Sequence, residues 1–217
     1  MNVAVTAGPT REAIDPVRFL SNRSSGRMGF AIAETAARQG HSVRLIAGPV
    51  TLQTPPFVER IDVESAEDMY RAVAAAVPWA QAMILAAAVA DFRPAAYSPL
   101  KTPKDSSSRT LLLEPAPDIL GSLRHPLGFS GFLAGFAAET HDLEEHARKK
   151  LLAKDCDLIV ANEVGKPGAG FDSPDNAVLL LFRSGRILPL PLASKTSIAA
   201  SLWQAVEEAI TQVPSRP

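Results

Sequence analysis

The sequence has few of the features that mark secreted, membrane-spanning or nucleic-acid-binding proteins. Cys156 is its one cysteine, which excludes an intramolecular disulfide and a cysteine-based zinc site. Lys and Arg total 22 against 23 Asp and Glu, so the net charge is −1 and no basic surplus points to nucleic acid. The longest apolar runs, Ala82–Ala90 and Ala177–Phe182, are too short to span a bilayer, and no signal segment opens the chain. We therefore expect a soluble, cytoplasmic protein with neither a membrane nor a nucleic acid as partner.

Apolar runs alternate with amphipathic stretches along the chain. Its 217 residues, 47% of them hydrophobic, predict a single domain over residues 1–217. Strands are expected at Val3–Val5, His41–Ala47, Met83–Val89, Leu133–Ala138 and Leu158–Ala161. Helices are expected at Met28–Arg38, Ala66–Ala76, Asp142–Ala153 and Ile198–Ile210. This alternation predicts an α/β fold with a mainly parallel sheet and right-handed crossovers.

Two insertions interrupt the alternation. The first, at about 93–116, is rich in Pro, Ser and Lys, and only Thr110–Leu113 within it is strand-like. The second, at about 164–192, begins with a Gly- and Pro-rich loop and continues as a predicted hairpin of Asn176–Phe182 and Arg186–Leu190 around Ser184-Gly185. Such segments commonly form flaps, binding loops or subunit contacts, so we expect a small lid or dimerisation element.

The segment after the first strand favours an anion. Thr6–Thr10 supplies small residues, and the polar segment Ser21–Gly29 leads into a helix that begins near Ser25. A helix N-terminus attracts negative charge, and Arg23 and Arg27 add positive charge, so phosphate is the expected ligand. We expect it to contact Gly8, Ser24, Ser25 and Gly26. The spacing is not G-x-G-x-x-G, and a serine N-cap in an ordinary polar loop remains the alternative.

Three more charged positions have both a functional and an ordinary interpretation. Asp91 follows small residues at the end of a predicted strand, where it could hold a ribose hydroxyl or a metal ion, or only cap a turn. Lys150 and Lys154 lie four residues apart on a predicted helix, where they could bind a polyanion or form a solvated basic face.

The remaining candidates are weaker. Lys101 and Lys104, in the first insertion, could belong to a mobile lid, although most lysines in such loops have no function. The four histidines (41, 125, 141 and 146) have no metal-binding spacing, and His141 and His146 are five residues apart, unlike a one-face helical pair. Metal ligands therefore stay unassigned.

Several motifs in this order resemble a known family. They are Thr6–Glu12, Asp15–Arg18, Ser21–Gly29, Ala87–Arg93, Lys101, Pro117–Leu120, Gly135–Thr140, Lys150, Lys154 and Asp157–Asn162. Together they resemble the bacterial phosphopantothenate–cysteine ligases of coenzyme A biosynthesis, which are often fused to a flavin-dependent decarboxylase. The resemblance extends over nearly the whole chain.

The resemblance implies a Rossmann-like, doubly wound homodimer with ligase activity. It implies that 4′-phosphopantothenate and L-cysteine are joined with CTP and Mg²⁺ through an acyl-cytidylate, with release of pyrophosphate and CMP. No decarboxylase portion and no flavin site are expected in this chain. Whether the protein is naturally monofunctional or an excised domain stays open.

Individual residues take their expected roles from the same resemblance. Asn22 matches the asparagine that handles the acyl-cytidylate, and Lys101 matches the lysine needed for nucleotide use. Bacterial members commonly read Glu-Lys-Ile-Lys-Lys around that lysine, whereas this chain reads Leu100–Lys104 with a proline at 103. Nucleotide-binding positions are matched by Leu85, Ala86, Ala87, Asp91, Lys101, Pro117, Asp118, Ile119, Leu120, Phe136, Lys150 and Lys154.

Two other functions fit the same fold, since a fold does not fix a function. An NAD(P)-type oxidoreductase would carry an acidic residue at the end of the second strand, but the chain reads Ile46–Pro49 there, which counts against NAD. A non-catalytic nucleotide-binding module is the other alternative. Pyrophosphate release in the presence of CTP, phosphopantothenate and cysteine would distinguish the ligase from that module.

Overall fold

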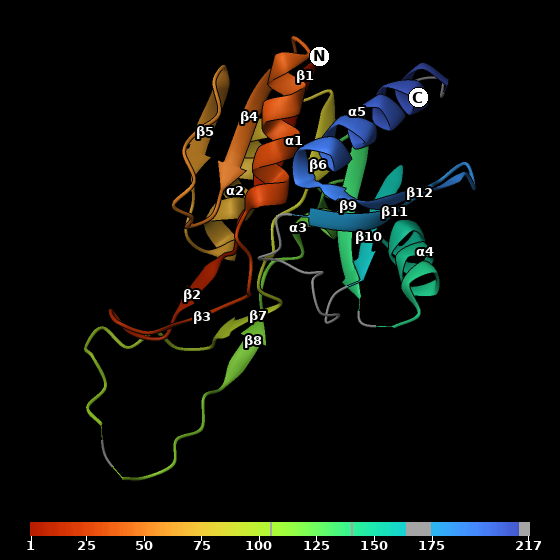
Figure 1. Cartoon of the computed structure of the whole chain (residues 1–217). Coiled ribbons are helices and arrows are strands. Elements are labelled where there is room, and N and C mark those ends of the chain that lie inside the picture. The colour runs from red at the N-terminus through yellow and green to blue at the C-terminus, as the bar shows by residue number, and fades with distance from the viewer. Residues whose placement is uncertain (105, 140, 164–174, 213–217) are drawn as a thin grey trace.

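The computed structural model describes residues 1–104, 106–139, 141–163 and 175–212. Within these ranges an eight-stranded sheet, in the order β12-β11-β10-β9-β6-β1-β4-β5, lies between two layers of helices (Figure 1). Its strands are β1 Asn2–Ala7, β4 Ser42–Ala47, β5 Val58–Asp62, β6 Ala82–Leu85, β9 Phe132–Glu139, β10 Leu158–Glu163, β11 Asp175–Phe182 and β12 Ile187–Ser194. The helices are α1 Arg27–Arg38, α2 Ala66–Ala76, α3 Ile119–Ser122, α4 Leu143–Ala153 and α5 Lys195–Gln212. Two short pairs, β2 Arg11–Ala13 with β3 Phe19–Ser21 and β7 Phe92–Pro94 with β8 Leu113–Pro115, lie outside this sheet.

The sheet confirms the predicted Rossmann-like arrangement. The strands from β5 through β4, β1, β6 and β9 to β10 pair in parallel, and β11 and β12 extend the β10 edge as antiparallel strands. From β1 the chain adds β4 and β5 toward one edge of the sheet. It then returns to β6, on the opposite side of β1, and adds β9, β10, β11 and β12 toward the other edge. The direction of winding therefore reverses between β1 and β6, and ligands of open α/β sheets bind beside such a point.

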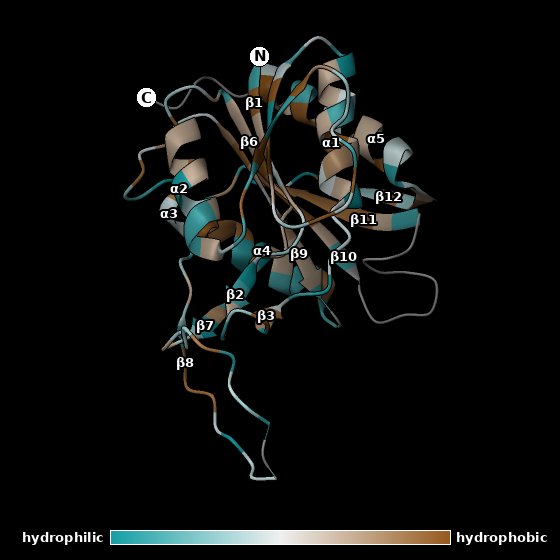
Figure 2. Cartoon of the chain, turned by 90° about the vertical axis from the view of Figure 1, so that its left-hand side faces the viewer, coloured by the Kyte–Doolittle hydropathy of each residue, from teal (hydrophilic) through white to brown (hydrophobic). Residues whose placement is uncertain are grey.

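Helices cover both faces, which explains the continuous apolar runs of the central strands. On one face α1 and α5 pack over Val3 and Val5, and the buried Trp203 indole donates to the Ile32 carbonyl oxygen at 2.8 Å. On the other face α2, α3 and α4 form a second buried cluster, which includes Met69 and Leu151. Figure 2 shows the apolar colouring along the central strands between these layers. Among the described residues, no helix has both the length and the apolar character needed to cross a membrane.

Several boundaries differ from the prediction. The hairpin β11–β12 is confirmed, but it completes the central sheet and so does not form a separate insertion; residues 164–174 lie outside the described ranges. Strand β6 ends at Leu85, because the next residues leave the sheet to form a pocket wall. In the first insertion the strand is Leu113–Pro115 and not Thr110–Leu113, because pairing with β7 decides its position.

The first insertion forms an arm that projects from the body beyond β7 and β8 (Figure 1). The buried carboxylate of Asp15 anchors it: Thr102 N donates to Asp15 Oδ2 at 3.3 Å, and Arg18 donates to the Thr102 carbonyl oxygen at 2.9 Å. The Arg18 guanidinium, together with backbone N–H donors, holds the pKa of Asp15 well below its usual range. The arm therefore has one fixed point close to Lys101.

Candidate functional site

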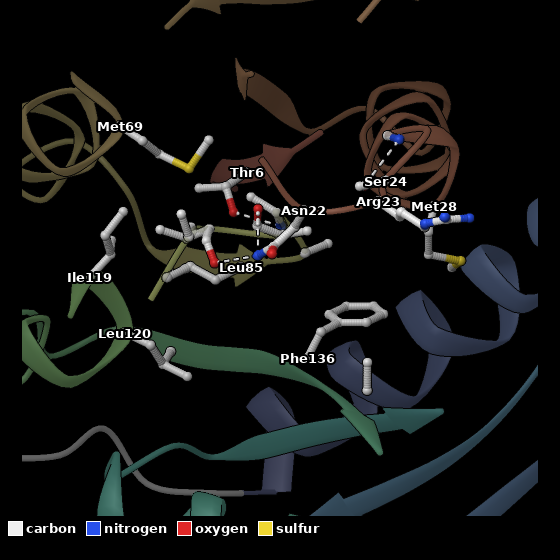
Figure 3. A pocket seen from close by; sticks show the side chains of 18 of the residues that line it. Thr6, Asn22, Arg23, Ser24, Met28, Met69, Leu85, Ile119, Leu120 and Phe136 are labelled. Atoms are coloured by element: carbon white, nitrogen blue, oxygen red, sulfur yellow. Dashed lines mark hydrogen bonds between the residues drawn. The ribbon is translucent and has the colours of Figure 1, made fainter. Parts of the chain in front are cut away.

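A pocket of about 660 Å³ opens at the carboxyl ends of β1, β6 and β9, beside the point where the winding reverses (Figure 3). Its walls bring together most of the residues expected from the sequence. These are Asn22, Ser24, Ser25, Gly26, Leu85, Ala86, Ala87, Asp91, Pro117, Asp118, Ile119, Leu120, Phe136, Lys150 and Lys154. In Figure 3, Ile119 and Leu120 lie on one side, Ser24 and Met28 on the other, and Asn22, Leu85 and Phe136 between them.

The N-terminus of α1 forms one wall. The N-cap is Gly26, with φ of 74°, and no side-chain hydrogen bond caps the helix, so the alternative interpretation, a serine N-cap, is wrong. Glycine adopts this left-handed conformation without strain, and the first amides of a helix lack intrahelical acceptors. Gly29 lets α1 pack closely on β1, because a Cβ there would lie 2.5 Å from the Ala7 Cβ. The geometry of this wall therefore suits an anion, and anion binding here stays a prediction.

Hydrogen bonds join the loops that follow β1 and β6. Ala87 N donates to Thr6 Oγ1 at 3.2 Å, and Ala90 N donates to Thr10 Oγ1 at 3.0 Å. Ala88 N donates to the Gly8 carbonyl oxygen at 2.9 Å. Gly8, which was expected to contact the ligand, is not among the residues that line the pocket. It holds the loop that follows β6 through this hydrogen bond. These bonds give the small-residue wall a fixed backbone.

Asn22 is held against this wall by its amide nitrogen. Nδ2 donates to the Val89 carbonyl oxygen at 2.8 Å and approaches the Ala88 carbonyl oxygen at 3.5 Å, as the dashed lines in Figure 3 indicate. The side chain is exposed to the pocket and carries no charge. It is thus a neutral, oriented polar group at the centre of the pocket.

Lys150 and Lys154 enter the pocket, while their basic neighbours point outward. Lys150 Nζ donates to the Phe136 carbonyl oxygen at 2.8 Å, and Lys154 pairs with Asp118. Lys149, by contrast, is exposed and pairs with Glu145 at 2.6 Å. A uniformly solvated basic face is therefore wrong for this helix.

The pocket environment shifts the pKa of two of these groups. Burial lowers the pKa of Lys150, and the charge on Lys154 adds to that effect, whereas Glu139 and Asp91 oppose it. Burial opposes ionisation of Asp118, but the Lys154 ammonium and the Gly121 N–H together hold its pKa below the usual range. The pocket therefore concentrates positive charge that its own acidic groups balance only in part.

Sequence reasoning missed three polar pocket residues. Asn162 on β10, Asn176 on β11 and Lys195 at the start of α5 are all buried and line the pocket. Asp175, the first residue of β11, pairs with Ser194, the last residue of β12. Because α5 begins directly after β12, the antiparallel pairing places Asn176 and Lys195 close together. Asn162 is the last residue of the motif Asp157–Asn162, but no role was assigned to it. No local sequence pattern indicated Asn176 or Lys195.

The structure also places Lys101, Cys156 and the pair of His141 and His146. Lys101 is exposed in the arm and does not line the pocket. Burial raises the pKa of Cys156 to about 12, so its thiol is unsuited to nucleophilic chemistry. His141 and His146 have ring centroids 5.1 Å apart, although their spacing is not that of a pair on one face of a helix. Helical spacing does not apply because His141 precedes α4.

Comparison with known proteins gives a consistent result. The family described as the DNA/pantothenate metabolism flavoprotein C-terminal domain matches residues 1–210. The coenzyme A biosynthesis bifunctional protein CoaBC of Escherichia coli K12 is 47% identical over 194 residues, which cover 88% of this chain and 48% of that protein. The chain spans about half the length of the curated relatives it matches.

Solved structures support the fold. The crystal structure of the C-terminal domain of CoaBC has a TM-score of 0.83 and 38% identity, covering 98% of this chain and 96% of that one. A Cab2 H337A mutant in complex with phosphopantothenate-cysteine has a TM-score of 0.75 and 17% identity, covering 96% and 87% of the two chains. At that identity the Cab2 likeness concerns the fold alone.

Proposed function

The chain belongs to the DNA/pantothenate metabolism flavoprotein C-terminal domain family, and we propose that it is a phosphopantothenate–cysteine ligase acting in coenzyme A biosynthesis. One observation carries this proposal: a single pocket combines the N-terminus of α1, which no side chain caps, the two lysines of α4 and the neutral amide of Asn22. Phosphates suit the helix end and the lysines, and an uncharged acyl group suits the amide.

The proposed reaction has two steps. The phosphopantothenate carboxylate attacks the α-phosphorus of CTP, an acyl-cytidylate forms and pyrophosphate leaves. The cysteine amine then attacks the acyl carbon, which forms the amide, loses a proton and releases CMP. Lys150 and Lys154 would stabilise charge on the phosphates, and Asn22 would orient the acyl carbonyl without repelling the phosphoryl group.

The pocket also suits the Mg²⁺ that accompanies a nucleoside triphosphate. Mg²⁺ is usually held by one or two carboxylates together with substrate phosphates. Asp91 is exposed to the pocket, whereas Asp118 already pairs with Lys154, so Asp91 is the better candidate ligand. When bound, Mg²⁺ would neutralise charge on the leaving pyrophosphate.

We predict that continuous turnover, measured as pyrophosphate release, requires all three substrates and is faster with CTP than with ATP. Without cysteine the first step should release at most about one equivalent of pyrophosphate per site. Parallel coupled pyrophosphate assays with each nucleotide, each omitting one substrate in turn, measure this. Equal or faster turnover with ATP would contradict the nucleotide assignment but leave the ligase intact. Nucleotide binding without pyrophosphate release would favour the non-catalytic module.

We also predict a homodimer that contacts through the arm. Leu100 and Leu112 on the arm are 77% and 74% exposed, and Tyr97, Leu111 and Leu113 of the same segment are exposed as well. Single exposed apolar side chains are common, but several gathered on one segment commonly mark a protein interface. Light scattering at micromolar concentration should give a dimer mass for the wild type and a monomer mass for the Leu100→Asp/Leu112→Asp variant. Leu152→Asp, at a similarly exposed leucine on α4, is the matched control and should stay dimeric. A monomeric wild type would refute the prediction.

Lys101 is proposed to assist nucleotide use. It lies on the arm and outside the pocket lining, so this role requires the arm to move or to reach the pocket of a second protomer. The anchor at Thr102 limits such movement, because Asp15 and Arg18 hold its backbone.

A further inference from the structure

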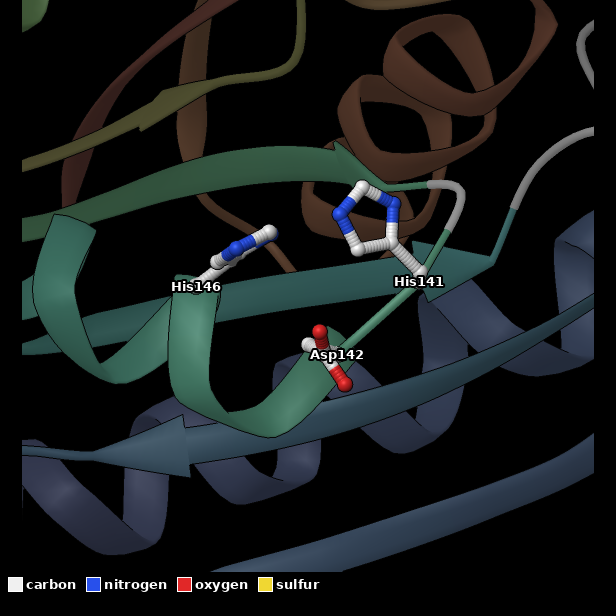
Figure 4. Close-up of side chains that lie close together, drawn as sticks. All are labelled: His141, Asp142 and His146. Atoms are coloured by element: carbon white, nitrogen blue, oxygen red, sulfur yellow. The ribbon is translucent and has the colours of Figure 1, made fainter.

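Two histidines and an aspartate gather at the start of α4, outside the pocket. His141, Asp142 and His146 each offer one ligand atom, and these atoms all lie within 4.8 Å of one another (Figure 4). The two rings meet edge to face, with an interplanar angle of 78°. We propose that these three residues form a binding site for a first-row transition-metal dication such as Zn²⁺.

Glu139 completes the arrangement from the end of β9. Its Oε2 lies 3.0 Å from His146 Nδ1, so the ring can donate there and present Nε2 to a metal. Metal-binding histidines commonly donate their second ring N–H to a carboxylate, which fixes the tautomer and the ring orientation. Glu139 therefore acts as a positioning residue for His146.

Asp142 has a carboxylate that the helix does not use. It occupies the N-cap of α4 with φ of 48°, and its side chain makes no capping hydrogen bond. Zinc ligands lie about 2.0–2.2 Å from the ion, so the three groups must approach one another slightly. Both His141 and Asp142 are exposed, which allows that adjustment by side-chain rotation.

The donor set discriminates between metals. Imidazole ligands favour Zn²⁺, Ni²⁺ and Cu²⁺, whereas Mg²⁺ prefers oxygen ligands. The site is thus chemically distinct from the one proposed for Mg²⁺ at Asp91, and none of its three residues lines the pocket. With three protein ligands it would leave a coordination position for water.

Calorimetric titration of the metal-free full chain with Zn²⁺ alone tests the proposal. We expect one equivalent to bind, with no displacement by excess Mg²⁺. His141→Gln and His146→Gln should each weaken binding at least about tenfold, and Glu139→Gln by about tenfold. His125→Gln is the matched control, because His125 is also exposed but lies away from the cluster, and it should bind Zn²⁺ as the wild type does.

Co²⁺ substitution gives a second readout, because its visible absorption reports coordination by nitrogen in a low-coordinate site. That absorption should be lost in His146→Gln while circular dichroism stays unchanged. Wild-type Zn²⁺ affinity in both cluster variants, or an equal loss in His125→Gln, would overturn the proposal. The titration uses no nucleotide, so its result is independent of the proposed ligase activity.

Discussion

Replacing Lys150 and Lys154 together by alanine is expected to raise the nucleotide KM tenfold or more. Both ammonium groups line the pocket, and Lys150 is held there by the Phe136 carbonyl oxygen at 2.8 Å. A hydrogen bond to a charged group contributes about 1.5–3 kcal/mol, and about 1.4 kcal/mol corresponds to a tenfold change in affinity. Because Lys154 is partly exposed, screening reduces its share, and Lys150 should account for most of the effect.

Lys149→Ala is the matched control for this double variant. Lys149 lies on the same helix but is exposed and pairs with Glu145, so its loss should leave KM within about twofold of wild type. The melting temperature of the double variant should stay within about 4 °C of wild type, because removal of the partly buried Lys150 charge offsets the lost Lys154–Asp118 pair. Steady-state kinetics with CTP gives KM, and an unchanged KM in the double variant would remove both lysines from the site.

The sequence predicted the central fold because the inner strands are covered on both faces. β1, β6, β9 and β10 appear as apolar runs, and a run of this kind is readable without knowledge of its neighbours. β5 was missed because it is an edge strand whose residues are largely exposed or half-buried. In the pairs β2–β3 and β7–β8 each strand has three residues. So short a segment shows no periodic pattern in the sequence, and only its pairing with the partner strand identifies it.

Parts of the site that are local sequence patterns were predictable, whereas residues that only the tertiary structure brings together were not. The glycine-rich start of α1 and the two lysines on α4 are local patterns, and the structure brings both into one pocket. Asn176 and Lys195 reach that pocket only because β11 and β12 return antiparallel to the sheet edge. The approach of His141 to His146 depends on the turn before α4, where Asp142 adopts positive φ, and helical periodicity does not describe that turn.

Asn22→Asp is expected to slow the cysteine step by about a hundredfold or more. The activation step should slow less. Asn22 Nδ2 donates to the Val89 carbonyl oxygen at 2.8 Å, and an aspartate would lose that donor. It would also place a negative charge next to two carbonyl oxygens and close to the expected phosphoryl group. The acyl-cytidylate should therefore accumulate, and mass spectrometry before and after addition of cysteine would detect it.

Asn22→Ala distinguishes the two causes of this effect. Alanine removes the same donor without adding charge, so it should slow the cysteine step less than aspartate does if repulsion dominates. Because Asn22 is exposed, both variants are expected to fold, and circular dichroism checks this. Equal rates of the cysteine step in the two variants would show that loss of the amide donor, and not charge repulsion, slows this step. An intermediate that never forms, or that clears at the wild-type rate, would exclude Asn22 from the second step.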